Sequence, residues 1–184
     1  MAPVVILAGG KSSRMGKDKT KLLYGGETLL ERAFRRFSAR FEVVISARGD
    51  VGIPDARVIY DIVPGLGPIS GLHAALTEFE AVFLVAADMP FADSAIAERV
   101  IAHGQGFPAC AAVSRGSVEP LFAYYTRQVM PEIEKSLQSG DYSLHGLLSR
   151  VGARLFEVDS EMLDNINRPE DYEKLKSHIE LDKI

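Results

Sequence analysis

The sequence contains one cysteine among 184 residues and has no excess of basic charge. A single thiol, Cys110, cannot form a disulfide within the chain and has no companions for a zinc site. It lies in an apolar run and is predicted to be a small buried side chain rather than a nucleophile. The net charge of −4 and the pI of about 5.6 provide no general attraction for nucleic acid or for an anionic membrane.

The chain also lacks long hydrophobic runs, signal-like features and repeats. No segment approaches the ~20 apolar residues that cross a bilayer, and residues 1–3 offer no cationic start for a signal peptide. We therefore expect a cytoplasmic protein, a monomer or weak oligomer, with no membrane or nucleic-acid partner. The four histidines show neither metal-ligand spacing nor a paired nucleophile, and we expect them at the surface or in packing roles.

Short apolar runs alternate with amphipathic stretches of helical length. The strand-like runs are residues 4–8, 43–45, 57–60, 82–86 and 109–113, and the helix-like stretches between them are residues 28–39, 69–79 and 94–103. This alternation predicts an α/β fold with a mostly parallel sheet, whose loops after each strand lie along one edge. Later segments predict a strand at 118–124, helices at 127–138 and 143–148, a strand at 152–158 and a closing helix at 169–181.

A basic, glycine-containing loop follows the first predicted strand. Gly9, Gly10 and Gly16 allow the backbone to approach a ligand closely, and the cations of the loop are Lys11, Arg14, Lys17 and Lys19. Cations and backbone donors at the carboxyl end of a strand predict a polyphosphate site. The alternative is a flexible, solvated basic loop, because glycine-rich loops alone give many false matches.

Two common phosphate-binding motifs do not fit this loop. A P-loop requires a glycine five residues before Gly10, where the sequence has Val5. No G-x-G-x-x-G follows the first strand, which argues against a dinucleotide-binding fingerprint. If this loop binds phosphate, it therefore does so through a different sequence pattern.

Residues 7–19 (LAGGKSSRMGKDK) resemble the signature of nucleotidyltransferases, and most of all that of the molybdenum cofactor guanylyltransferases, the MobA family. Further segments resemble the other motifs of this family in the same order: Asp61 with residues 64–71 (PGLGPISG), residues 87–91 (ADMPF), residues 119–125 (EPLFAYY) and residues 165–171 (NINRPED). The resemblance thus extends from residue 4 to about residue 175.

The resemblance implies one Rossmann-like domain of the nucleotide-diphospho-sugar transferase type. Residues 1–113 would form its nucleotide-binding half and residues 114–184 its acceptor-binding half. The implied reaction is the Mg²⁺-dependent transfer of GMP from GTP to the terminal phosphate of Mo-molybdopterin. Other proteins of molybdenum cofactor synthesis are then expected partners.

Asp88 is the residue with the sharpest chemical prediction. It follows a buried apolar strand, and Pro90 would end that strand in a turn. A carboxylate there suits Mg²⁺ that bridges phosphates, whereas the alternative is a turn or N-cap aspartate. Arg14 and Lys19 are expected to stabilise charge on the phosphates, and the resemblance makes Asp88 the metal ligand.

Other residues are assigned to the nucleotide. The resemblance implies nucleotide contacts for Leu7, Ala8, Gly9, Gly10, Lys19, Asp61 and Asp88. Asp61 would accept hydrogen bonds from guanine or from the ribose, but a simple loop carboxylate is an equal alternative without the resemblance. Ser46 stands where the family more often has asparagine. Gly9 favours GTP, because related cytidylyltransferases usually have alanine there.

The acceptor is assigned to the C-terminal part of the chain. Asn165 and Asn167 match an N-x-N motif that the family associates with the pterin, although Asn167 also suits a turn or cap before Pro169. Cytidylyl or other nucleotidyl transfer to molybdopterin or to a sugar or alcohol phosphate is the nearest alternative. A nucleotide-binding module without turnover and a flavodoxin-like interaction domain are the alternatives from other classes.

Overall fold

The computed structural model describes residues 1–8, 22–61, 65–158, 163, 166 and 171–172. The strands of its main sheet are β1 (Val4–Leu7), β4 (Val43–Ser46), β5 (Arg57–Ile59), β6 (Ala81–Ala86), β7 (Ala109–Ser114), β8 (Ser117–Thr126) and β9 (Arg154–Glu157). They lie in the order β5-β4-β1-β6-β8-β7-β9, and β8 alone among them runs antiparallel to its neighbours. The described fold is therefore α/β with a mostly parallel sheet, as predicted.

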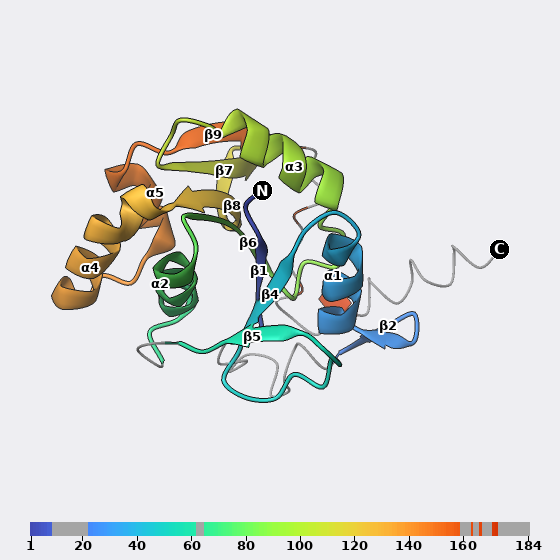
Figure 1. Cartoon of the computed structure of the whole chain (residues 1–184). Coiled ribbons are helices and arrows are strands. Elements are labelled where there is room, and N and C mark those ends of the chain that lie inside the picture. The colour runs from blue at the N-terminus through green and yellow to red at the C-terminus, as the bar shows by residue number, and fades with distance from the viewer. Residues whose placement is uncertain (9–21, 62–64, 159–162, 164–165, 167–170, 173–184) are drawn as a thin grey trace.

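Helices cover both faces of the sheet (Figure 1). The described helices are α1 (Leu29–Ser38), α2 (Pro68–Glu78), α3 (Ser94–His103), the short 3₁₀ turn η2 (Arg127–Val129), α4 (Met130–Ser139) and α5 (Leu144–Arg150). Val4 and Ile6 of β1 pack in one core with α1 and α3, whereas Val5 packs in a second core with α2, α4 and α5. This alternation follows from the period of two along a strand.

The order in which the chain adds strands to the sheet reverses at β1. The chain passes from β1 through α1 to β4 on one side, and later returns through α2 to β6 on the other side of β1. The register pairs Leu7 with Ser46 of β4 and with Ala86 of β6, so three strands end at the same level. In open α/β sheets, ligands bind outside the carboxyl ends of the strands at such a reversal.

Local sequence signals account for the helix boundaries. Thr28 and Glu31 form a reciprocal capping box at the start of α1, and Pro68 occupies the first turn of α2 as predicted. Helix α3 begins and ends at the predicted residues. The predicted strands are also present, with boundaries shifted by one or two residues. The closing helix predicted at 169–181 falls almost wholly outside the described residues.

A small hairpin before α1 was not predicted. Strands β2 (Leu23–Tyr24) and β3 (Glu27–Thr28) pair antiparallel across Gly25 and Gly26, whose φ angles are 61° and 93°. Two consecutive glycines with positive φ are a typical hairpin connection, so this signal was present in the sequence. The strands contain only two residues each, too few to show an alternating pattern.

None of the helices in the described part of the chain combines the length and the apolar character that a membrane span requires.

Candidate active site

Three strand ends are tied together where the basic loop begins. The main-chain N–H of Ala8 donates to the carbonyl oxygen of Ser46 at 2.9 Å, and the N–H of Ala87 donates to the carbonyl oxygen of Leu7 at 3.2 Å. The backbone of β1 is thus held on both sides up to Ala8, the last described residue before the loop. Leu7 and Ala8, both assigned to the nucleotide, lie at this edge.

Ser46 and Asp61 come together at the ends of the neighbouring strands β4 and β5. The Ser46 hydroxyl donates a hydrogen bond of 3.4 Å to Oδ1 of Asp61. Ser46 is buried, with 4% of its surface exposed, whereas Asp61 is half-buried. The hydroxyl therefore orients one carboxylate oxygen and leaves the carboxylate partly accessible. Sequence reasoning selected Asp61 but found no partner for it.

Gly71 explains how α2 approaches this pair so closely. A Cβ atom at Gly71 would lie 2.6 Å from Oγ of Ser46 and 2.7 Å from Cδ2 of Leu7. Real Cβ atoms do not approach other atoms to this distance, so the absence of a side chain lets the helix pack against the ends of β1 and β4. Gly71 thereby allows α2 to pack directly against the side chain of Ser46.

Asp88 lies in a turn immediately after β6, at the same edge of the sheet. Its neighbours Ala87 and Met89 are buried, each with 2% of its surface exposed, and Asp88 is half-buried. The N–H of Met89 donates to the carbonyl oxygen of Ala86 at 3.3 Å and closes the turn. Asp88 is therefore a turn residue, as one form of the structural alternative predicted. The N-cap form of that alternative is wrong, because the side chain of Asp93 caps α3.

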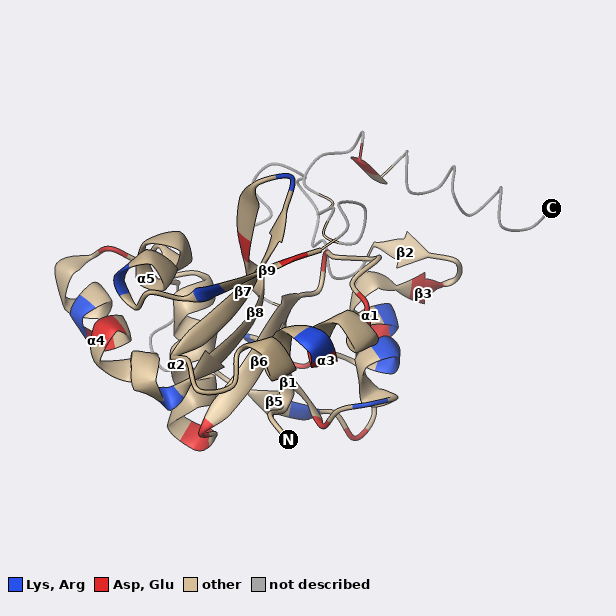
Figure 2. Ribbon diagram, turned by 90° about the horizontal axis from the view of Figure 1, so that it is seen from above, with Lys and Arg blue, Asp and Glu red and all other residues tan. Residues whose placement is uncertain are grey.

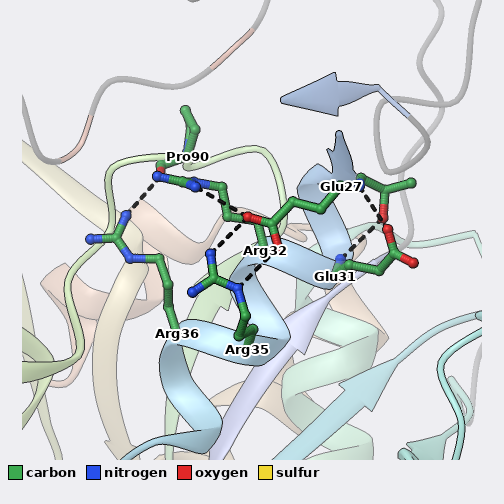
Figure 3. Close-up of polar contacts among 7 residues, drawn as sticks. Glu27, Glu31, Arg32, Arg35, Arg36 and Pro90 are labelled. Carbon is green, nitrogen blue, oxygen red and sulfur yellow. Dashed lines mark hydrogen bonds and ion pairs between the residues drawn. The ribbon is translucent and has the colours of Figure 1, made fainter. Parts of the chain in front are cut away.

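A cluster of arginines from α1 holds the segment that follows Asp88. Figure 3 shows Arg32 and Arg36 converging on the carbonyl oxygen of Pro90, at 3.1 and 2.8 Å. Glu27 of β3 accepts hydrogen bonds from Arg32 and Arg35, and these charges form a band over β3 and α1 in Figure 2. Sequence reasoning missed the arginines, because only their spacing of four residues hinted at a common face.

The C-terminal part of the chain returns to the same turn. The N–H of Ile166 donates to the carbonyl oxygen of Asp88 at 3.1 Å. Ile166 packs in a small third core with Tyr24 and Leu29, and the hydroxyl of Tyr172 donates to the carbonyl oxygen of Leu23 at 2.8 Å. A residue 78 positions further along the chain is therefore bonded to the Asp88 turn.

The β7–β8 hairpin extends beyond the main body of the sheet (Figure 2). A register shift between Ala111 and Ala112 marks a bulge in this pair. The connection places Arg115 and Gly116 at φ angles of 49° and 73°. At the bulge, Glu119 pairs with Ala112 and accepts a hydrogen bond from the N–H of Leu121 at 3.3 Å.

The donor set at this edge suits a metal held mainly through phosphates. No three His, Cys, Asp or Glu side chains gather into a metal-binding group within the described residues. Mg²⁺ is commonly bound by one or two carboxylates together with substrate phosphates and water, rather than by an all-protein cage. The half-buried carboxylate of Asp88 fits this mode.

Cys110 is fully buried in β7, as predicted. Burial raises the pKa of its thiol to about 11, which disfavours the reactive thiolate. Among the histidines, His73 and His103 are half-buried and His145 is exposed, in agreement with surface or packing roles. His178 lies outside the described residues.

Several expected site residues also lie outside the described part of the chain. These are Gly9, Gly10, Arg14, Lys19, Asn165 and Asn167. Two described residues border them: Ala8 precedes the basic loop, and Ile166 separates the two asparagines. Asp61 and Asp88 lie on opposite sides of β1, at the ends of β5 and β6.

Many α/β enzymes bind nucleotides at the carboxyl ends of parallel strands, where the strand order reverses. The acidic residues Asp61 and Asp88 follow strands at this edge. A family described as "MobA-like NTP transferase domain" matches residues 4–156. The chain belongs to this family of nucleotidyltransferases, as the sequence motifs predicted.

Individual relatives match over nearly the whole chain. A protein from Peptoclostridium acidaminophilum named "Probable molybdenum cofactor guanylyltransferase" is 30% identical, with 91% of this chain and 85% of the relative covered. A "Molybdenum cofactor guanylyltransferase" from Rhizobium johnstonii is 30% identical over 96% of this chain and 92% of its own. The crystal structure of molybdopterin-guanine dinucleotide biosynthesis protein A from Archaeoglobus fulgidus superposes with a TM-score of 0.84 at 26% identity, covering 99% of this chain and 100% of the other.

Proposed function

We propose that this protein transfers GMP from GTP to the terminal phosphate of Mo-molybdopterin, giving the guanine dinucleotide cofactor and pyrophosphate. The names of relatives that match along almost the full chain support this assignment. The observation that carries it is the placement of Asp61 and Asp88 on either side of β1, at the carboxyl edge from which the basic loop departs.

The nucleotide would lie along this edge. Leu7 and Ala8, with Gly9 and Gly10 beyond them, would provide backbone contacts to GTP, because glycine permits close approach. Asp61, held by Ser46, would accept hydrogen bonds from the guanine or the ribose. A carboxylate that meets an N–H and an exocyclic amine of guanine would favour GTP over CTP, as Gly9 also does.

Charge at the phosphates would be balanced by Asp88 through Mg²⁺ and by two cations. Asp88 would hold the metal, which when bound neutralises phosphate charge and polarises the α-phosphoryl group. Arg14 would fork onto phosphate oxygens, and Lys19 would provide a point charge near the α-phosphate. Nucleotidyl transfer requires mainly positioning and charge stabilisation from a protein.

The reaction would be a single in-line displacement. An oxygen of the acceptor phosphate would form a bond to the α-phosphorus of GTP, while the bond from that phosphorus to the β-phosphate oxygen breaks and pyrophosphate leaves. No covalent enzyme intermediate is needed. Asn165 and Asn167 would orient the pterin, so residues 114–184 would form the acceptor half and residues 1–113 the nucleotide half of one domain.

The test is nucleotide binding followed by turnover. Thermal unfolding would be compared with GTP, CTP, ATP and UTP, each with and without Mg²⁺, because a ligand that binds the native state raises its stability. A Mg²⁺-dependent shift confined to GTP, followed by pyrophosphate release with Mo-molybdopterin, is expected. A preference for CTP would instead assign a cytidylyltransferase, and binding without pyrophosphate release would assign a non-catalytic module. A cytoplasmic location and contacts with other molybdenum cofactor proteins remain predictions.

A further inference from the structure

Two positively charged side chains bind a single carbonyl oxygen beside Asp88. Nε of Arg32 and one terminal nitrogen of Arg36 donate to the oxygen of Pro90, two residues after Asp88. The arginines are four residues apart on α1, so they share one face of the helix. Figure 3 shows both guanidinium groups directed at the same oxygen.

Two positive charges meet at one partly buried oxygen, and the carboxylates of Glu27 and Asp93 balance part of this charge. The side chains of Arg32 and Arg36 are only 20% and 24% exposed. Burial, aided by the nearby charge of Arg32, lowers the pKa of the Arg36 guanidinium, which shows that the site disfavours its charge. A carbonyl oxygen has two lone pairs and can accept both donors. Proline has no N–H, so the carbonyl is the polar main-chain group through which this residue can be held.

Further contacts of the arginines secure the same segment. The guanidinium of Arg32 lies 4.3 Å from the centre of the Tyr24 ring, and Tyr24 meets Phe91 edge-on with the ring centres 6.4 Å apart. Arg36 lies 3.6 Å from Asp93, the N-cap of α3. The segment is therefore held to α1 directly by the main chain at Pro90 and by the side chain of Asp93. The ring of Phe91 adds an indirect contact through Tyr24 of β2.

We propose that Arg32 and Arg36 are positioning residues that fix the direction in which the turn at residues 87–90 presents the Asp88 carboxylate to Mg²⁺ and nucleotide. They act through the Pro90 carbonyl and are not catalytic residues. The inference rests on the proposed function, because that function assigns Asp88 to the metal. Loss of the contact should raise the Mg²⁺ concentration that GTP binding requires, while the sheet stays folded.

The experiment compares two double variants that each remove two positive charges. Arg32→Met/Arg36→Met removes both donors to Pro90. Arg35→Met/Arg40→Met is the matched control: within the described residues, Arg35 contacts Glu27 and Arg40 contacts Glu98, and neither contacts Pro90. Hydrogen–deuterium exchange of residues 87–93 is measured without ligand. Calorimetry then measures GTP binding over a series of Mg²⁺ concentrations.

Faster exchange at residues 87–93 is expected in the first variant and not in the control. The Mg²⁺ concentration needed for half-maximal GTP binding should rise about tenfold or more in the first variant, as is usual when a group that orients a metal ligand is lost. Unchanged exchange, or an equal change in the control, overturns the proposal. Faster exchange with an unchanged Mg²⁺ requirement also overturns it.

Two additions keep the result decisive. If the double variant does not fold, Arg36→Met is judged by the same criteria, since it leaves the contact between Arg32 and Tyr24 in place, and Arg36→Lys should restore part of the effect. If the wild-type protein binds GTP with Mg²⁺ but forms no dinucleotide, the proposed function fails while the binding series still decides the role of the arginines. A wild-type protein that binds no GTP with Mg²⁺ contradicts both.

Discussion

The main-chain N–H of Ile166 donates to the carbonyl oxygen of Asp88 over a distance of 3.1 Å. Ile166 is buried, with 3% of its surface exposed, and its sequence neighbours are the two asparagines assigned to the acceptor. This main-chain bond connects the C-terminal motif with the residue whose carboxylate is assigned to the metal. It places the motif proposed to bind the acceptor beside the residue proposed to hold the metal.

Replacement of that carboxylate should abolish most activity without unfolding the protein. Asp88→Asn keeps the size of the side chain but removes the negative charge that Mg²⁺ requires. We expect pyrophosphate release to fall on the order of 100-fold, because a metal contributes several kcal/mol to charge stabilisation in the transition state. Asp55→Asn, at an exposed loop aspartate, is the control. Turnover of Asp88→Asn near the wild-type rate would contradict the metal assignment.

Ser46 should affect nucleotide binding more than turnover. Ser46→Ala removes the long hydrogen bond of 3.4 Å to the Asp61 carboxylate. We expect a cost of at most about 1.5 kcal/mol, the lower end for a bond to a charged group. The KM for GTP is expected to rise about twofold to tenfold with kcat unchanged, the pattern of a lost ground-state contact. Steady-state kinetics measures both. Ser136→Ala, at a buried serine of α4, should leave KM unchanged, and an equal effect there would contradict a local role for Ser46.

Gly71 should not tolerate a methyl group. In Gly71→Ala the new Cβ would meet Ser46 and Leu7 at 2.6 and 2.7 Å, so α2 must move away from the strand ends. Overpacking of this kind costs about 1–3 kcal/mol of unfolding free energy. The displacement of α2 should also weaken GTP binding. In the control Gly146→Ala the nearest atom belongs to the flexible Arg150 side chain. Urea unfolding measures the stability of both variants. Wild-type stability in Gly71→Ala would show that α2 shifts at little cost and would contradict the prediction.

Glu27 should make stability depend on pH in the acidic range. Hydrogen bonding from Arg35, with a smaller contribution from Arg32, lowers the pKa of Glu27 below its ordinary value of 4.5. A lowered pKa means that the carboxylate stabilises the fold above about pH 4.5 and loses this effect as pH falls through the folded-state pKa. Glu27→Gln should therefore be less stable than wild type at pH 7 by under about 1 kcal/mol. Urea unfolding at pH 7 and pH 3 should show the difference shrinking, and a constant difference would contradict this assignment.

Cys110 should be inert while the protein is folded. The thiol is buried and its pKa is raised to about 11, so at pH 8 it is protonated and shielded from reagents. Iodoacetamide followed by mass spectrometry should detect no modification of the native protein and full modification in guanidinium chloride. Rapid modification of the native protein would place Cys110 in a region that opens readily.

The local features of this fold could be predicted because they depend on residues near one another in sequence. Strands β1 and β6 are short apolar runs, and α3 has its predicted limits because Asp93 caps it and Gly104 ends it. The family was also predicted, because the motifs that resemble it occur in the same order along the chain. Asp61 and Asp88 were placed correctly at the carboxyl edge because each follows a predicted strand.

The sequence by itself determined the α/β class, the strand ends and the acidic residues at them, because periodicity and turn chemistry act over a few residues. Only the tertiary structure decided the antiparallel direction of β8 and the contact of Ser46 with Asp61. It also decided the hydrogen bonds from Arg32 and Arg36 to the Pro90 carbonyl. Arg32 and Pro90 are 58 residues apart, and no local propensity relates them. Their contact exists because α1 packs on the face of the sheet beside the end of β6.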